Sequence, residues 1–153
     1  MKELVDAHPE LLLVLFPVIL VVFSFLFAHI GAWSAIASEY RAWDAFEGKL
    51  WRSQRGGIGM TNYGNSLHVG ANDRGLHLSV IFLLRLWHPP LFVPWDDISA
   101  SEGRFLWSRW VDLRFKRVPG ARVRFAKGLA DEIRSAAGAH WPAGPTAVPI
   151  EPS

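Results

Sequence analysis

The feature that most constrains this chain is an uncharged run of twenty residues, Leu11 to Ile30, near its N-terminus. A helix rises 1.5 Å per residue, so a run of this length spans about 30 Å, the thickness of the hydrocarbon core of a bilayer. Pro17 predicts a kink, which membrane helices tolerate. We therefore expect a transmembrane helix over residues 11–32, preceded by a short tail of residues 1–10.

The expected anchor consists of large apolar side chains and ends at an aromatic residue that would lie at the membrane interface. These residues are Leu11, Phe16, Ile19, Phe23, Phe27, Ile30 and Trp33. His29 is interpreted as a neutral imidazole that reaches the same interface. The alternative is a cleaved signal peptide ending at Ala35-Ile36-Ala37. The apolar run is longer than a signal core, however, and the segment before it is acidic rather than basic.

Basic residues near the two ends of the run predict its orientation. Only Lys2 precedes the run, whereas Arg41, Lys49, Arg52 and Arg55 follow it. Because basic residues favour the cytoplasmic side, we expect the N-terminus outside and the remainder of the chain in the cytoplasm.

Composition limits the rest of the chain to one domain without disulfide bonds. Of 153 residues, about 100 remain after the anchor and the terminal tails, which suits a single compact domain. The formal net charge of +2 and the mixing of basic with acidic residues argue against nucleic-acid binding. Zero cysteines exclude disulfides, thiolate metal sites and cysteine nucleophiles in this sequence.

Residues 33–53 carry apolar side chains at steps of three or four, which predicts an amphipathic linker helix. We expect its apolar face to pack on the domain, with a helix on the lipid surface as the alternative. The apolar positions are Trp33, Ile36, Tyr40, Trp43, Phe46 and Leu50. The glycine-rich segment 54–59 has neither Rossmann nor P-loop spacing and predicts a flexible connection or a turn.

From Ser66 onward the apolar period becomes two, which predicts a mainly β domain over residues 54–138 with about seven short antiparallel strands. Turns are expected at 72–75 and at Pro119-Gly120, and Leu91 to Pro94 is expected as an edge strand. Leu129 to Ala137 predicts a C-terminal helix that caps a curved sheet or partly open barrel. The proline-rich residues 139–153 predict a disordered tail.

Two segments of the β domain resemble a group of small bacterial membrane-anchored proteins of unknown role. The segments are Gly75-Leu76-His77-Leu78-Ser79-Val80 and the run from His88-Pro89-Pro90 to Trp95-Asp96-Asp97-Ile98. The resemblance extends over about Trp33 to Ala137 and implies a pleckstrin-homology-like (PH-like) or GRAM-like bent barrel of seven strands, at the bacterial inner membrane. Inositol-lipid binding is not carried over, because the loop between the first strands offers only Asp73 and Arg74.

The sequence offers no strong catalytic or metal constellation. His68, His77 and His88 show no spacing that would make them converge on a metal, and His77 is expected to be exposed. Neither Ser79 nor Ser108 lies in a nucleophile elbow, and Asp96-Asp97 is interpreted as a solvated turn or helix cap. We expect no enzyme activity, no cofactor and no small-molecule substrate.

Tryptophans around the Pro-Pro segment give a candidate interface. Trp107 and Trp110 flank Ser108-Arg109 at an expected turn and would form an exposed aromatic and basic tip, while Trp95 is expected in the core. The candidate interface residues are Trp107, Arg109, Trp110 and Trp87. The leading hypothesis is a membrane-anchored adaptor that binds a membrane-protein partner. The alternatives are an accessory subunit of a membrane complex and a sensor of lipid headgroups.

Overall fold

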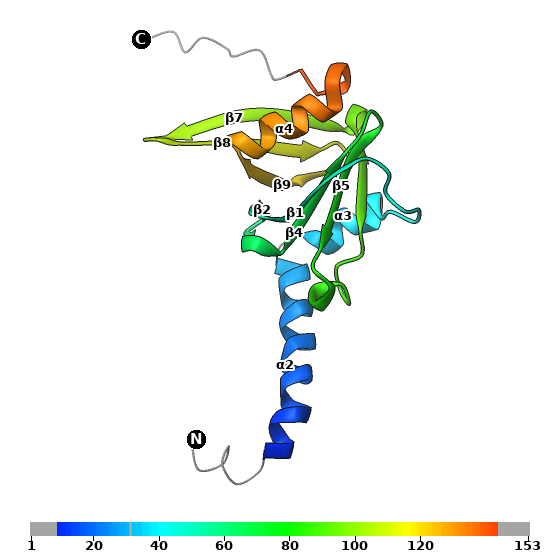
Figure 1. Cartoon of the computed structure of the whole chain (residues 1–153), viewed down its shortest axis with the longest axis vertical. Coiled ribbons are helices and arrows are strands. Elements are labelled where there is room, and N and C mark those ends of the chain that lie inside the picture. Colours follow the sequence, from blue (N-terminus) through cyan, green and yellow to red (C-terminus); the bar gives the residue numbers. More distant parts are fainter. Residues whose placement is uncertain (1–8, 31, 144–153) are drawn as a thin grey trace.

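The computed structural model describes residues 9–30 and 32–143, and within the first helix it describes the side chains of residues 10–26. Figure 1 shows this helix, α2 (Pro9–Ile30), below a β domain that carries the helix α4 (Lys127–Ala137). Among the described residues, no helix is both long enough and apolar enough to cross a membrane. Residues 1–8 of the expected N-terminal tail (1–10), residues 144–153 of the expected C-terminal tail (139–153), and the side chains of Phe27, His29 and Ile30 lie outside the described residues.

A second helix, α3 (Trp33–Tyr40), follows α2 and packs into the β domain. Trp33, Ile36 and Tyr40 are buried, which confirms that the linker packs on the domain. Trp33 does not belong to a lipid-facing belt, because it is 0% exposed and its indole N–H donates to the carbonyl of Pro89 at 3.0 Å.

The predicted linker helix is wrong beyond Tyr40. Arg41 leaves the helix to form an antiparallel bridge with Leu91, and the Ala42 N–H donates to Pro90 O at 2.8 Å. These long-range hydrogen bonds replace the next helical turn. Trp43 is 81% exposed, so the apolar period through this segment does not mark one buried face.

The first sheet is antiparallel and has the strand order β1-β4-β5-β6. Its strands are β1 (Lys49–Gln54), β4 (Leu67–Ala71), β5 (Gly75–Val80) and β6 (Leu91–Pro94). The turn at 72–75 is confirmed, because the Asn72 side chain accepts the backbone N–H groups of Arg74 and Gly75. The edge position of β6 is also confirmed. Short 3₁₀ turns are η1 (Gly64–Ser66), η2 (Phe82–Leu84) and η3 (Trp95–Asp97).

The second sheet is antiparallel and has the strand order β3-β2-β9-β8-β7. Its strands are β2 (Gly56–Ile58), β3 (Thr61–Asn62), β7 (Ile98–Phe105), β8 (Ser108–Phe115) and β9 (Val118–Ala126). Only Arg55 separates β1 from β2, so the chain passes directly from one sheet to the other.

Two segments that contain glycine, 54–59 and Pro119-Gly120, differ from their predicted structure. Residues 56–58 form a strand, and the turn follows at 59–60. Gly56 is needed for close packing, since a Cβ there would lie 2.7 Å from Leu67 Cδ2. The turn between β8 and β9 falls at Lys116-Arg117 instead of Pro119-Gly120. Its two N–H groups donate to Asp97 O at 2.8 Å and to Tyr40 Oη at 3.0 Å.

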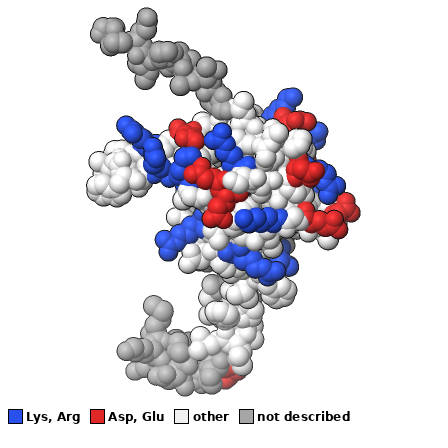
Figure 2. All heavy atoms as spheres, turned by 45° about the horizontal axis from the view of Figure 1, so that its top comes forward, with Lys and Arg blue, Asp and Glu red and all other residues white. Residues whose placement is uncertain are grey.

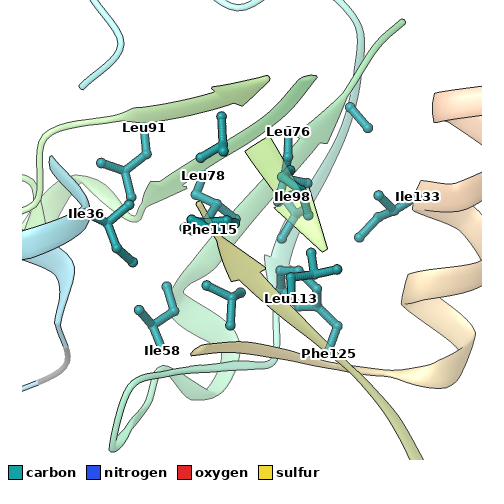
Figure 3. Packing of buried hydrophobic residues seen from close by; sticks show 14 of the residues in the cluster. Ile36, Ile58, Leu76, Leu78, Leu91, Ile98, Leu113, Phe115, Phe125 and Ile133 are labelled. Atoms are coloured by element: carbon teal, nitrogen blue, oxygen red, sulfur yellow. The ribbon is translucent and has the colours of Figure 1, made fainter. Parts of the chain in front are cut away.

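Side chains from both sheets, α3 and α4 form one core, part of which Figure 3 shows. Leu76, Leu78 and Leu91 come from the first sheet, and Leu113 and Phe125 come from the second. The predicted C-terminal helix is confirmed as α4, with Ala130, Ile133 and Ala137 buried. The chain after α4 is not extended at once, because η4 (Gly138–His140) follows and Trp141 packs on Trp95 with ring centroids 5.8 Å apart.

Candidate functional site

The hairpin between β7 and β8 ends in three exposed apolar side chains, Phe105, Leu106 and Trp107. Their exposed fractions are 69%, 70% and 87%. Figure 1 shows this hairpin extending sideways from the domain, away from α2. We call residues 104–109 the hairpin tip.

The hairpin tip departs from the usual chemistry of tight turns. Leu106 has a φ of 52°, a left-handed conformation that favours Gly or Asn. Arg104 and Arg109 face each other in the strand register, and like charges at directly opposed positions are destabilising. Figure 2 shows basic residues beside an uncharged projection on this side of the molecule, whereas both signs of charge mix over the rest of the visible face. The tip therefore keeps residues that cost stability, and such residues suit recognition.

The four candidate interface residues do not form one surface. Trp107 and Arg109 lie in the hairpin tip, but Trp110 lies further along β8. Its indole covers Gly103, and the Arg124 guanidinium carbon lies 4.5 Å from its ring centroid. Trp87 lies near α2, where its ring packs edge-on against Phe25 with centroids 5.2 Å apart.

Sequence reasoning missed Phe105 and Leu106. The run Phe-Leu-Trp carries no Gly, Pro, Asn or Asp to mark a turn, so local patterning favours a strand across it. The one available signal is three consecutive large apolar residues between two arginines.

A buried polar cluster joins α2 to the domain. Ser24 on α2 donates to Leu84 O at 3.2 Å, and His88 Nδ1 donates to the same carbonyl at 2.9 Å. The Tyr63 hydroxyl then donates to His88 Nε2 at 3.1 Å, and the Trp33 ring lies edge-on to His88 with centroids 5.1 Å apart. Every member of this junction cluster therefore has a partner.

Burial keeps the junction cluster neutral. Removal from water lowers the pKa of His88 and raises the pKa of Tyr63 above its usual range. A neutral, hydrogen-bonded cluster of this kind fixes the geometry at the junction of α2 and the domain. The residues involved are far apart in sequence, so no local motif points to this cluster.

A cavity of about 260 Å³ lies between the outer face of the first sheet and the loop 41–47. Phe46 from this loop stacks on His77, with ring centroids 4.7 Å apart and 15° between the ring planes. His77 is therefore buried, at 8% exposure, and the expectation that it is exposed is wrong. Its Nδ1 atom has no hydrogen-bond partner among the described residues. The walls carry Arg41 and Arg74 as well as Asp44 and Glu47, so they favour neither sign of ligand charge.

The other residues considered for chemistry are dispersed. His68 Nδ1 accepts the backbone N–H of Ser53 at 3.0 Å, and Ser108 lies on the exposed hairpin tip. Asp97 accepts the Tyr40 hydroxyl at 3.0 Å, while Asp96 is exposed. Within the described ranges, no three His, Asp or Glu side chains converge to hold a metal ion.

The fold defines a mainly β domain of two antiparallel sheets with a C-terminal helix, attached to one long N-terminal helix. Comparison of the chain with protein-family models, with curated proteins and with solved structures finds no match.

Proposed function

We propose that this protein is a membrane-anchored, non-catalytic adaptor that binds a protein partner through the hairpin tip. The observation that carries the proposal is the exposure of Phe105, Leu106 and Trp107 between two opposed arginines. A partner that fits this tip has an apolar pocket bordered by carboxylates, which would relieve the repulsion between Arg104 and Arg109.

The proposed anchor is residues 11–32. Nearly all described side chains of α2 are apolar and exposed, including Leu11 (51%), Phe16 (68%), Ile19 (49%) and Phe23 (56%). An apolar surface of this extent is unfavourable in water and calls for lipid or protein around it.

We propose the bacterial inner membrane as the location, with the β domain in the cytoplasm, on the basis of the basic residues that follow the anchor. We also propose that the β domain is PH-like. The passage of the chain between two antiparallel sheets at Arg55, together with the helix α4, supports this proposal. Tethering to the membrane would raise the effective concentration of weak partners at its surface.

Photo-crosslinking in native membranes tests the adaptor function. A photoreactive phenylalanine analogue replaces Trp107 in the full chain, and the matched control carries it at Met60, which is 91% exposed on the turn between β2 and β3. We expect a protein adduct from position 107 and none from position 60. Adducts with lipid alone at position 107 would favour a lipid sensor, and equal adducts at both positions would contradict a specific tip.

The accessory-subunit alternative relied on small residues along one face of the anchor. That face comprised Ser24, Ala28 and Gly31 with Ala32, of which Ser24 and Ala32 are described. Ser24 is turned toward the domain, and its hydroxyl donates to Leu84 O. It is therefore occupied within this chain, and we favour the adaptor. Recovery of a stoichiometric set of membrane proteins after mild solubilisation would reverse this preference.

A further inference from the structure

The connection from β5 to β6 exposes a second apolar surface, separate from the hairpin tip. Its residues are Phe82, Leu83, Leu86 and Trp87, with exposed fractions of 81%, 58%, 64% and 42%. Arg85 is the single charged residue between them. Connections between strands usually carry polar and turn-forming residues, so this composition needs a reason outside the fold.

Two contacts hold this apolar connection beside α2. Ser24 donates to Leu84 O at 3.2 Å, and the rings of Phe25 and Trp87 meet edge-on at 5.2 Å. Figure 1 shows the connection as the green turn next to the upper part of α2. Ser24 lies six residues before Ile30, the last residue of α2, which corresponds to about 9 Å along the helix axis. The connection is therefore level with residues inside the proposed anchor.

Several backbone groups in and beside the connection are paired within the protein. The N–H groups of Ile81, Leu84 and Arg85 donate to Ser66 O, Ile81 O and Phe82 O at 2.9–3.2 Å. The Leu84 carbonyl accepts from both Ser24 and His88. Such internal pairing is what irregular backbone requires at membrane depth. Arg85 is exposed, and its Nε–H donates to Val80 O at 3.3 Å, which holds the guanidinium group near the end of β5.

We propose that residues 82–87 form a second membrane contact, which enters the outer part of the bilayer beside α2. This inference rests on the proposed insertion of α2. The ligand is lipid, namely the acyl chains and the carbonyl region near the headgroups. Aromatic and aliphatic side chains on one turn, close to a basic residue, match the chemistry of this region. The anchor and residues 82–87 together would fix the tilt of the domain over the membrane.

Depth-dependent fluorescence quenching tests the inference on the full chain. The sequence has no cysteine, so single cysteines carry an environment-sensitive dye without background labelling. The sites are Leu83→Cys in the apolar connection, Leu15→Cys as the reference for α2, and Met60→Cys as the exposed control. Each variant is placed in vesicles of phosphatidylcholine and phosphatidylglycerol that contain lipids with a quencher either near the headgroup or deep in the acyl chain. Circular dichroism establishes that the three variants keep the same fold.

We expect quenching at Leu15 and at Leu83, with the headgroup-proximal quencher more effective at Leu83, and no quenching at Met60. Quenching at Leu15 but not at Leu83 would overturn the second contact and leave the anchor in place. Absence of quenching at both sites would overturn the anchor and the inference together. A blue-shifted dye at Leu83 that lipid quenchers do not reach would indicate cover by protein, which also overturns the inference.

Discussion

Tyr63 donates its hydroxyl to Nε2 of His88 at 3.1 Å, where α2 meets the β domain. His88 is 0% exposed, so removal of this donor leaves a buried nitrogen unpaired. We expect Tyr63→Phe to lower the free energy of unfolding by about 1–2 kcal/mol. Urea unfolding of the full chain in detergent micelles, followed by circular dichroism, measures this change. An unchanged unfolding midpoint would contradict the role of the bond.

The same pair should be energetically coupled. In a cycle of Tyr63→Phe, His88→Gln and the double variant, we expect a coupling free energy of about 0.5–2 kcal/mol, because the residues are in direct contact. Ser24→Ala combined with Tyr63→Phe provides the comparison, since Ser24 donates to Leu84 O and lies 3.5 Å from His88 Nδ1 rather than against Tyr63. Strict additivity for Tyr63 and His88 would refute a coupled cluster.

We expect the folded protein to lose stability in mild acid because of His77. Burial under Phe46 lowers the pKa of His77 to about 4, below the value of about 6.5 expected in the unfolded chain. The unfolded state therefore binds more protons between these values, and stability falls as the pH drops from about 6.5 toward 4. We expect a contribution of about 1–2 kcal/mol, reduced from the full shift because water reaches part of the site.

Urea unfolding at pH 7.5 and pH 4.5 measures this loss. Burial also lowers the pKa of His68 and of His88, so they contribute in the same direction. His77→Gln isolates the contribution of His77, because glutamine keeps a hydrogen-bond donor and does not titrate. Equal pH dependence of the variant and the wild-type chain would rule out His77 as a source.

A substitution of Leu106 should weaken binding at the hairpin tip without lowering the stability of the fold. Asparagine tolerates the left-handed conformation at φ of 52° better than leucine does, so Leu106→Asn should leave stability unchanged or raise it by up to about 1 kcal/mol. The same variant should weaken crosslinking from position 107. Thermal unfolding measures the stability of the variant, and the yield of photo-crosslinked product measures its binding. Leu50→Asn is the control, since it removes a leucine that is 38% exposed and is not at positive φ. If Leu106→Asn lowered stability as much as Leu50→Asn does, backbone strain at residue 106 would be contradicted.

Gly70 allows Phe46 to lie against the first sheet. A Cβ at residue 70 would lie 2.5 Å from Phe46 Cε1, so Gly70→Ala must displace the ring and loosen the loop 41–48. We expect a loss of about 1–3 kcal/mol in the free energy of unfolding and faster tryptic cleavage after Arg41, at the start of this loop. Gly120→Ala is the matched control, because no atom lies within 4 Å of a Cβ there. Unchanged cleavage in Gly70→Ala would show that Phe46 does not hold the loop.

The parts of the fold that the sequence predicts well are those set by local patterning. The alternation in Val111, Leu113 and Phe115 appears as a strand with one buried face, and Asn72 forms the predicted turn. These features depend on residues close together in sequence, where period and turn chemistry are reliable.

The missed features depend on partners far apart in sequence. Gly56-Gly57-Ile58 becomes a strand because β3 and the distant strand β9 pair with it, and the segment itself contains no signal for the pairing with β9. His77 lies on the face predicted to be exposed, and the loop that carries Phe46 covers it. Tertiary cover therefore overrides the two-residue period at this position.

The bond from Ser24 to Leu84 has a mechanical consequence. It ties the domain to α2 before that helix ends, and α3 ties it again through buried Trp33. Two points of attachment restrain rotation of the domain about a single joint, so we expect α2 and the domain to turn together. A rotation of α2 about its own axis would then move Trp107 along an arc. A protein bound to the hairpin tip would be displaced with it.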